Sequence, residues 1–203
     1  MDDTRPISDQ RRFQSALSRF DQENSKDPNR ETKDGQHLPR ELVYAERLTE
    51  WVVRLKSDAS EALLLAARSA HLCRWVIPRD SFPADRPGYL RWRQELKKFH
   101  SAKVGQILRE EGYEESEIAR VQGLVSKSAF PADPDSRILE DALCLVFLQW
   151  QFADLAAKNS DEKMINAVQK TWKKMSPLAQ KFALKLDYAP HEREILERAL
   201  GPL

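Results

Sequence analysis

The sequence is poor in cysteine and glycine and has no long apolar run, and each shortage excludes a class of protein. Two cysteines in 203 residues, Cys73 and Cys144, are too few for a disulfide framework, so we expect a reducing compartment. No apolar N-terminal run resembles a signal peptide, and no stretch is long enough for a membrane-spanning helix. We therefore predict a cytoplasmic protein without a membrane partner.

The chain also lacks an excess of charge of one sign. Its 33 basic and 32 acidic residues leave a net charge of +1, which provides no general attraction for nucleic acid, and we expect no DNA partner. Contact with a phosphorylated ligand must then come from a local cluster. The span from Arg74 to Lys103 is such a cluster, since it contains eight basic and three acidic residues.

Alternating strand patterns and glycine-rich phosphate loops are absent, whereas apolar residues recur at helical spacing along most of the chain. The pattern predicts an all-α protein with a single helical domain at 37–203. Residues 1–36 are expected to form a polar N-terminal segment with one amphipathic helix, followed by a loop at 24–36. The main helices are expected at 39–55, 59–77, 87–111, 114–127 and 136–157.

His71 and His100 are the most informative residues, because each interrupts an apolar, helix-like stretch. In the expected helix 59–77, His71 shares a face with Arg74, and in the expected helix 87–111, His100 shares a face with Arg93 and Lys97. If the two faces meet, they form a pocket with metal ligands or proton-transfer groups next to phosphate donors. The alternative is that each histidine donates to a carbonyl and that Asp141, within an apolar helix, forms a structural pair.

The run from Phe13 to about Tyr188 resembles the family called domain of unknown function 4202, which implies no particular activity. The residues that carry this resemblance are Asp27-Pro28-Asn29, Tyr44-Ala45-Glu46-Arg47, His71, Arg74-Trp75, Pro78-Arg79, Tyr89-Leu90-Arg91-Trp92-Arg93, Phe99-His100 and Thr171-Trp172-Lys173-Lys174-Met175.

The order of shorter motifs resembles the HD phosphohydrolase superfamily, which is all-α and holds one or two metal ions. His71 matches the histidine of the superfamily's His-Asp doublet and Asp141 its later aspartate, but Leu72 stands where the doublet has aspartate. Glu46 or Tyr44 lies nearest the position of the first helical histidine. The resemblance implies a divergent HD-like core.

Two functions follow from these residues. The first is a metal-dependent hydrolase of a phosphorylated small molecule or nucleotide, with His100 and Asp141 as catalytic residues. A divalent transition metal would be held by Glu46, His71, His100 and Asp141, and the substrate by Arg74, Arg79, Tyr89, Arg91, Arg93 and Lys97. The alternative is a non-catalytic binding module for a nucleotide, RNA or an acidic protein partner, which Leu72 favours.

Overall fold

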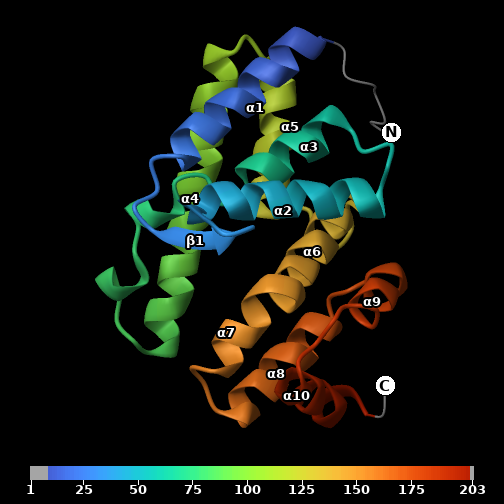
Figure 1. Ribbon diagram of the computed structural model, residues 1–203. Helices are drawn as coiled ribbons and strands as arrows, with labels where there is room; N and C mark the ends of the chain where they lie inside the picture. Colours follow the sequence, from blue (N-terminus) through green and yellow to red (C-terminus); the bar gives the residue numbers. More distant parts are fainter. Residues whose placement is uncertain (1–8, 202–203) are drawn as a thin grey trace. The chain divides into compact units, whose positions relative to one another are not determined.

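The computed structural model describes residues 9–201, and Figure 1 shows that they form mostly helices. This confirms the predicted all-α class. The α-helices are α1 (Gln10–Asn24), α2 (Arg40–Leu55), α3 (Glu61–Ser69), α4 (Arg86–Glu110), α5 (Glu115–Ser126), α6 (Pro134–Val146), α7 (Phe152–Ala156), α8 (Asp161–Trp172), α9 (Pro177–Ala183) and α10 (Pro190–Leu200). Between residues 9 and 201, no helix is both long and apolar enough to cross a membrane.

The chain forms two compact units, Met1–Ser136 and Arg137–Leu203. In the first unit α4 packs along α5, and α3 packs against both α2 and α5. Helix α1 belongs to this unit, where it contacts α2, α3 and α4 and buries Phe13, Ala16 and Phe20. The predicted N-terminal segment therefore contributes to the core of the first unit through its helix.

The polar run expected to be a loop contains a short hairpin, so that prediction was incomplete. Strands β1 (Arg30–Lys33) and β2 (Gln36–Pro39) pair antiparallel, with Arg30 opposite Pro39. The two residues of the turn, Asp34 and Gly35, have φ values of 52° and 76°. An Asp-Gly pair favours such a turn because both positions need a left-handed backbone.

Helix α3 ends at Ser69, so the prediction of one helix through residue 77 is wrong. Residues 70–73 form turns, and the chain continues in two short 3-10 helices, η1 (Arg74–Val76) and η2 (Arg79–Ser81). The chain reverses at Cys73, which adopts a left-handed conformation with φ 54°. Its N–H donates to the Oδ1 atom of buried Asn24 at 3.1 Å, so a tertiary hydrogen bond stabilises the reversal.

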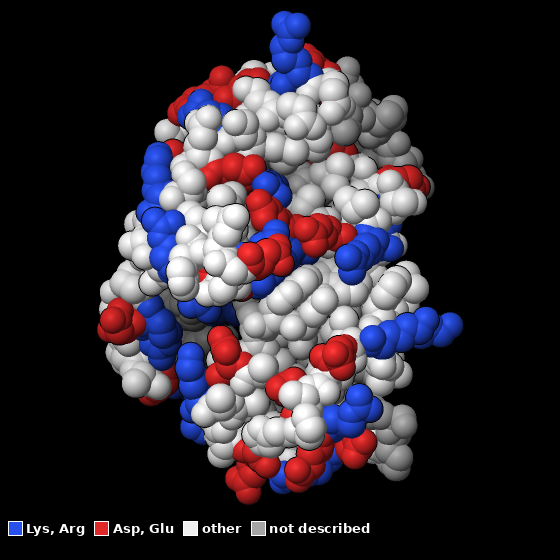
Figure 2. Space-filling model, in the orientation of Figure 1, with Lys and Arg blue, Asp and Glu red and all other residues white. Residues whose placement is uncertain are grey.

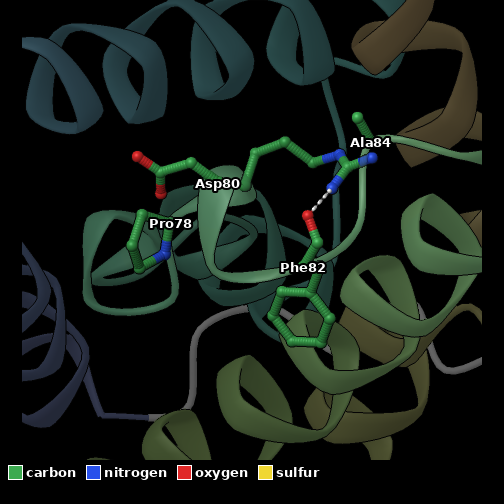
Figure 3. A pocket seen from close by; sticks show the side chains of 5 residues that line it. Pro78, Asp80, Phe82 and Ala84 are labelled. Carbon is green, nitrogen blue, oxygen red and sulfur yellow. Dashed lines mark hydrogen bonds between the residues drawn. The ribbon is translucent and has the colours of Figure 1, made fainter.

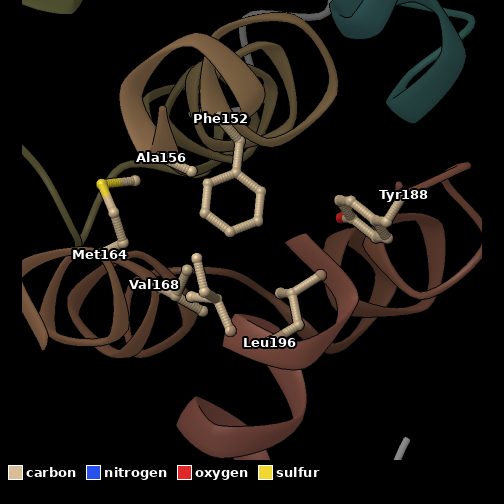
Figure 4. Packing of buried hydrophobic residues seen from close by; sticks show 7 residues of the cluster. Phe152, Ala156, Met164, Val168, Tyr188 and Leu196 are labelled. Atoms are coloured by element: carbon tan, nitrogen blue, oxygen red, sulfur yellow. The ribbon is translucent and has the colours of Figure 1, made fainter. Parts of the chain in front are cut away.

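The expected helix 136–157 is divided in the second unit. Helix α6 continues through the π-helical turn η3 (Phe147–Gln151) into α7. The core of this unit, drawn in Figure 4, joins α7, α8 and α10 through Phe152, Met164, Val168 and Leu196. Tyr188 closes the cluster, and its hydroxyl donates to the Ala183 carbonyl at 3.0 Å.

A buried carboxylate connects several elements of the first unit. Asp135 accepts hydrogen bonds from Lys56 at 3.2 Å, from the Ser60 hydroxyl at 3.0 Å and from Arg120 at 3.1 Å. Ser60 is also the N-cap of α3, and its hydroxyl accepts from the Leu63 N–H. The start of α6 is thereby joined to α2, α3 and α5.

We predict that Asp135→Ala lowers the free energy of unfolding by about 2–3 kcal/mol, because two cations and a hydroxyl lose their shared acceptor. The exposed neighbour Asp58 provides a control, and Asp58→Ala should change stability by less than about 0.5 kcal/mol. Urea unfolding of both variants measures the difference. Equal stabilities would show that the Asp135 network does not stabilise the unit.

Candidate functional site

His100 lies near the middle of α4 and is 4% exposed. Its Nδ1 atom is 2.9 Å from the Leu72 carbonyl oxygen. A carbonyl can only accept, so Nδ1 carries the proton and Nε2 of the neutral ring is an acceptor. Nε2 is buried and has no hydrogen-bond partner. Burial, together with His71, lowers the pKa of His100 to about 3, so the ring is neutral at physiological pH.

His71 lies in the reversal after α3 and stacks on Tyr44 of α2, with the ring centroids 4.2 Å apart. The centroid of the His100 ring is 6.0 Å from that of His71. Burial, reinforced by the charges of Arg74 and Arg93, lowers the pKa of His71 well below its ordinary value. A quarter of the His71 side chain is exposed to solvent. The positive charges of Arg74 and Arg93 therefore matter beside burial, because they also disfavour the protonated ring and lower its pKa.

Glu41, in the first turn of α2, lies beside these two histidines. We call His71, His100, Glu41 and Arg74 the His71 cluster. Its Oε2 atom is 3.6 Å from Nδ1 of His71 and has no hydrogen-bond partner. Burial raises the pKa of Glu41 to about 7, although the charge of Arg74 opposes this shift. The carboxyl group is therefore poised between its two protonation states near neutral pH.

Arg74 supplies the positive charge nearest to these groups. Its guanidinium carbon lies 4.8 Å from the centroid of the Trp92 ring, and the Trp92 N–H donates to the Ile77 carbonyl at 2.9 Å. Trp92 thus fixes the 3-10 segment to α4 and gives the guanidinium a flat surface. Burial lowers the pKa of Arg74, yet an arginine in a protein stays protonated.

More cations surround the cluster. Arg74, Arg93, Arg40 and Lys127 all oppose protonation of His71 through their charges. Figure 2 shows Lys and Arg side chains gathered along the left edge of the view, over the hairpin and α4. Both histidines are neutral, and the carboxyl groups beside them are Glu41 and the buried Asp27, which accepts from the Glu41 backbone N–H at 3.0 Å. The four cations outnumber these two carboxyl groups, so the cluster favours an anion.

An open pocket of about 720 Å³ adjoins this region and is drawn in Figure 3. It is lined by Pro78, Arg79, Asp80, Phe82 and Ala84. The Arg79 guanidinium donates to the carbonyls of Phe82 at 2.9 Å and Pro83 at 2.7 Å. This arginine therefore shapes the wall of the pocket.

A family model described as Domain of unknown function (DUF4202) matches residues 14–196. The chain belongs to this family. No curated protein and no solved structure matches the chain. In this DUF4202 member the matched segment covers most of each unit and all the residues of the His71 cluster.

The four expected metal ligands are divided between the two units. His71 and His100 lie together, but Glu46 pairs with Lys33 at 2.8 Å and lies 3.9 Å from Arg68. Asp141 belongs to the second unit, where it accepts from the backbone N–H of Ser176, the N-cap of α9, at 2.8 Å. Within residues 9–201, no three or more His, Cys, Asp and Glu side chains are grouped to hold a metal ion.

The expected substrate-binding residues separate in a similar way. Arg74 is part of the cluster, and Arg93 is close enough to act on His71 through its charge. Tyr89 lies 3.5 Å from Arg93 through its hydroxyl, whereas Arg79 lines the pocket. Arg91 and Lys97 are exposed on α4.

Glu41 was missed in the sequence, although a signal for it exists. Leu42, the first apolar residue after Pro39, is only half-buried, whereas Glu41 is 8% exposed. Position 41 lies in helical phase with Ala45, Leu48 and Val52, which are buried. An acidic residue in phase with an apolar face could have marked the site.

Because the pKa of Glu41 is raised to about 7 from 4.5, its contribution to stability is present below pH 4.5 and is lost as pH rises through 7. Glu41→Gln keeps the neutral shape at every pH. We expect the variant to gain stability relative to wild type, by up to about 3 kcal/mol, between pH 4.5 and pH 8. Urea unfolding at both pH values measures this gain.

The control is Glu50→Gln, which changes an exposed residue of the same helix and should show little pH-dependent difference. If Glu41→Gln differs from wild type in its free energy of unfolding by the same amount at pH 4.5 and at pH 8, that result would contradict the raised pKa of Glu41.

Proposed function

We propose that this protein binds a phosphorylated small molecule or nucleotide, with the phosphate among His100, Glu41 and Arg74. One observation carries the proposal. Next to Arg74, two buried polar atoms, Nε2 of His100 and Oε2 of Glu41, have no hydrogen-bond partner. Leaving such atoms unpaired costs about 1–3 kcal/mol each, so a ligand that pairs both of them would gain affinity.

A phosphate group matches these atoms chemically. A singly protonated phosphate has a hydroxyl that can donate to Nε2 of His100, which in this tautomer cannot donate itself. Its charged oxygens can accept from the guanidinium of Arg74 and from the protonated carboxyl of Glu41. Sulfate has a similar shape and charge but no hydroxyl near neutral pH, so the same site should bind it more weakly.

The size of the cluster favours a small ligand over a macromolecule. Its central groups are the buried side chains of Glu41 in α2 and His100 in α4, together with the reversal after α3. RNA and acidic proteins are bound mainly by extended exposed surfaces. The net charge of this chain is only +1, which adds no general attraction for them.

A metal-dependent hydrolase with a divergent HD-like core is the second candidate. It is favoured by Glu41, whose pKa of about 7 suits a general acid or base at neutral pH. His71 and His100 would be its imidazole groups. In the part of the chain that the structure describes, no three metal-ligating side chains are grouped.

Titration calorimetry with inorganic phosphate tests the first proposal. We expect wild type to bind phosphate more tightly than sulfate, and Arg93→Gln to weaken phosphate binding several-fold because one attracting charge is lost. The exposed neighbour Arg91→Gln is the matched control and should bind nearly as wild type. Absence of phosphate binding by folded wild type, or equal binding of sulfate, would contradict the proposed site.

The second candidate makes a separate prediction. A hydrolase of this kind should copurify with a divalent transition metal, and His71→Ala should lower the metal content sharply. Metal analysis of protein purified without chelator measures this, with His37→Ala, an exposed histidine of the hairpin, as control. Metal-free wild type whose melting temperature does not change with manganese, iron, nickel or zinc would exclude the metal-dependent hydrolase.

A further inference from the structure

We infer that the pocket lined by Pro78, Arg79, Asp80, Phe82 and Ala84 binds the nucleoside part of a nucleoside monophosphate whose phosphate lies in the His71 cluster. The inference rests on the proposed function and narrows its ligand class. Its basis is that Arg79, which lines the pocket, and Arg74, which belongs to the cluster, both lie over the Trp92 ring, and that the pocket and the cluster differ in chemistry.

Trp92 joins the two regions. The guanidinium carbon of Arg74 lies 4.8 Å from the centroid of the Trp92 ring, and that of Arg79 lies 5.9 Å from it. Both distances are measured to the same ring, so the separation of the two guanidinium carbons cannot exceed the sum of these two distances. A single mononucleotide spans such a distance between its phosphate and its base.

The pocket offers flat and apolar surfaces that suit a base. The guanidinium of Arg79 is held by the Phe82 and Pro83 carbonyls and lies over the Tyr89 and Trp92 rings, 5.9 Å from each centroid, so it is ordered before a base binds. Phe82 and Pro78 add an aromatic and an aliphatic wall. The volume of about 720 Å³ lies in the range of small-molecule sites.

Asp80 indicates which part of a nucleotide the pocket accepts. This exposed carboxylate lines the pocket, where it would repel a second phosphate group. It can accept hydrogen bonds from ribose hydroxyls or from the N–H groups of a base. Because Asp80 lines the pocket next to Arg79, a ligand whose single phosphate lies in the cluster is favoured over a triphosphate.

Titration calorimetry of wild type with AMP, GMP, CMP, UMP and ribose 5-phosphate tests the inference. At least one nucleotide should bind about fivefold or more tightly than ribose 5-phosphate, because stacking of a base adds affinity. Phe82→Ala should remove most of this advantage and leave the affinity for ribose 5-phosphate unchanged. If Phe82→Ala does not fold, Ala84→Trp, which fills part of the pocket, should weaken nucleotide binding more than ribose 5-phosphate binding.

Leu184→Ala, an exposed apolar position of the second unit, is the control and should bind all probes as wild type does. Equal affinities of wild type for the four nucleotides and ribose 5-phosphate would overturn the nucleoside pocket while the phosphate site stands. An equal loss of nucleotide and ribose 5-phosphate binding in Ala84→Trp would also overturn it. No binding of any probe, inorganic phosphate included, would overturn the proposed function itself.

Discussion

The hydrogen bond from Nδ1 of His100 to the Leu72 carbonyl is the interaction on which the site depends. It holds the reversal after α3 against α4, and it determines the tautomer of His100, so that Nε2 is an acceptor. It also keeps His71, the residue before Leu72, stacked between Tyr44 and the His100 ring. Without it, a buried carbonyl and a buried imidazole would both lack a partner, which costs about 1–3 kcal/mol for each group.

The cluster carries further unfavourable features that the surrounding packing has to offset. Nε2 of His100, Oε2 of Glu41 and Nδ2 of Asn24 are buried without hydrogen bonds, and Cys73 has a left-handed backbone. These features occur together around one reversal. Local strain and unpaired polar groups concentrate where a protein binds or reacts, because elsewhere they only lower stability. Their position supports a ligand site here more strongly than the charge of the chain, which is close to zero.

The sequence predicted the elements that rest on local patterns. The apolar faces of α4 and α5 and the stop at Gly112, with φ 78°, follow from periodicity and from glycine chemistry. His71, His100 and Arg74 could be identified from the sequence as candidate site residues, because polar groups in apolar stretches need partners. The end of α3 could not be predicted, because Asn24, far away in the sequence, holds Cys73. Nor could the partner of Asp141 be predicted, since its hydrogen bond with the Ser176 N–H is a tertiary contact within the second unit.

The most direct test of the account is the protonation of the His100 ring at pH 7, read from the ¹⁵N chemical shifts of its two nitrogens in a ¹⁵N-labelled sample, with His100→Gln for assignment. We predict a neutral ring with the proton on Nδ1 and a free Nε2, and a change in the Nε2 shift on addition of inorganic phosphate but little change with sulfate. A proton on Nε2, or an Nε2 shift that does not respond to saturating phosphate, would contradict the central claim that this atom is the ligand-facing acceptor of the site.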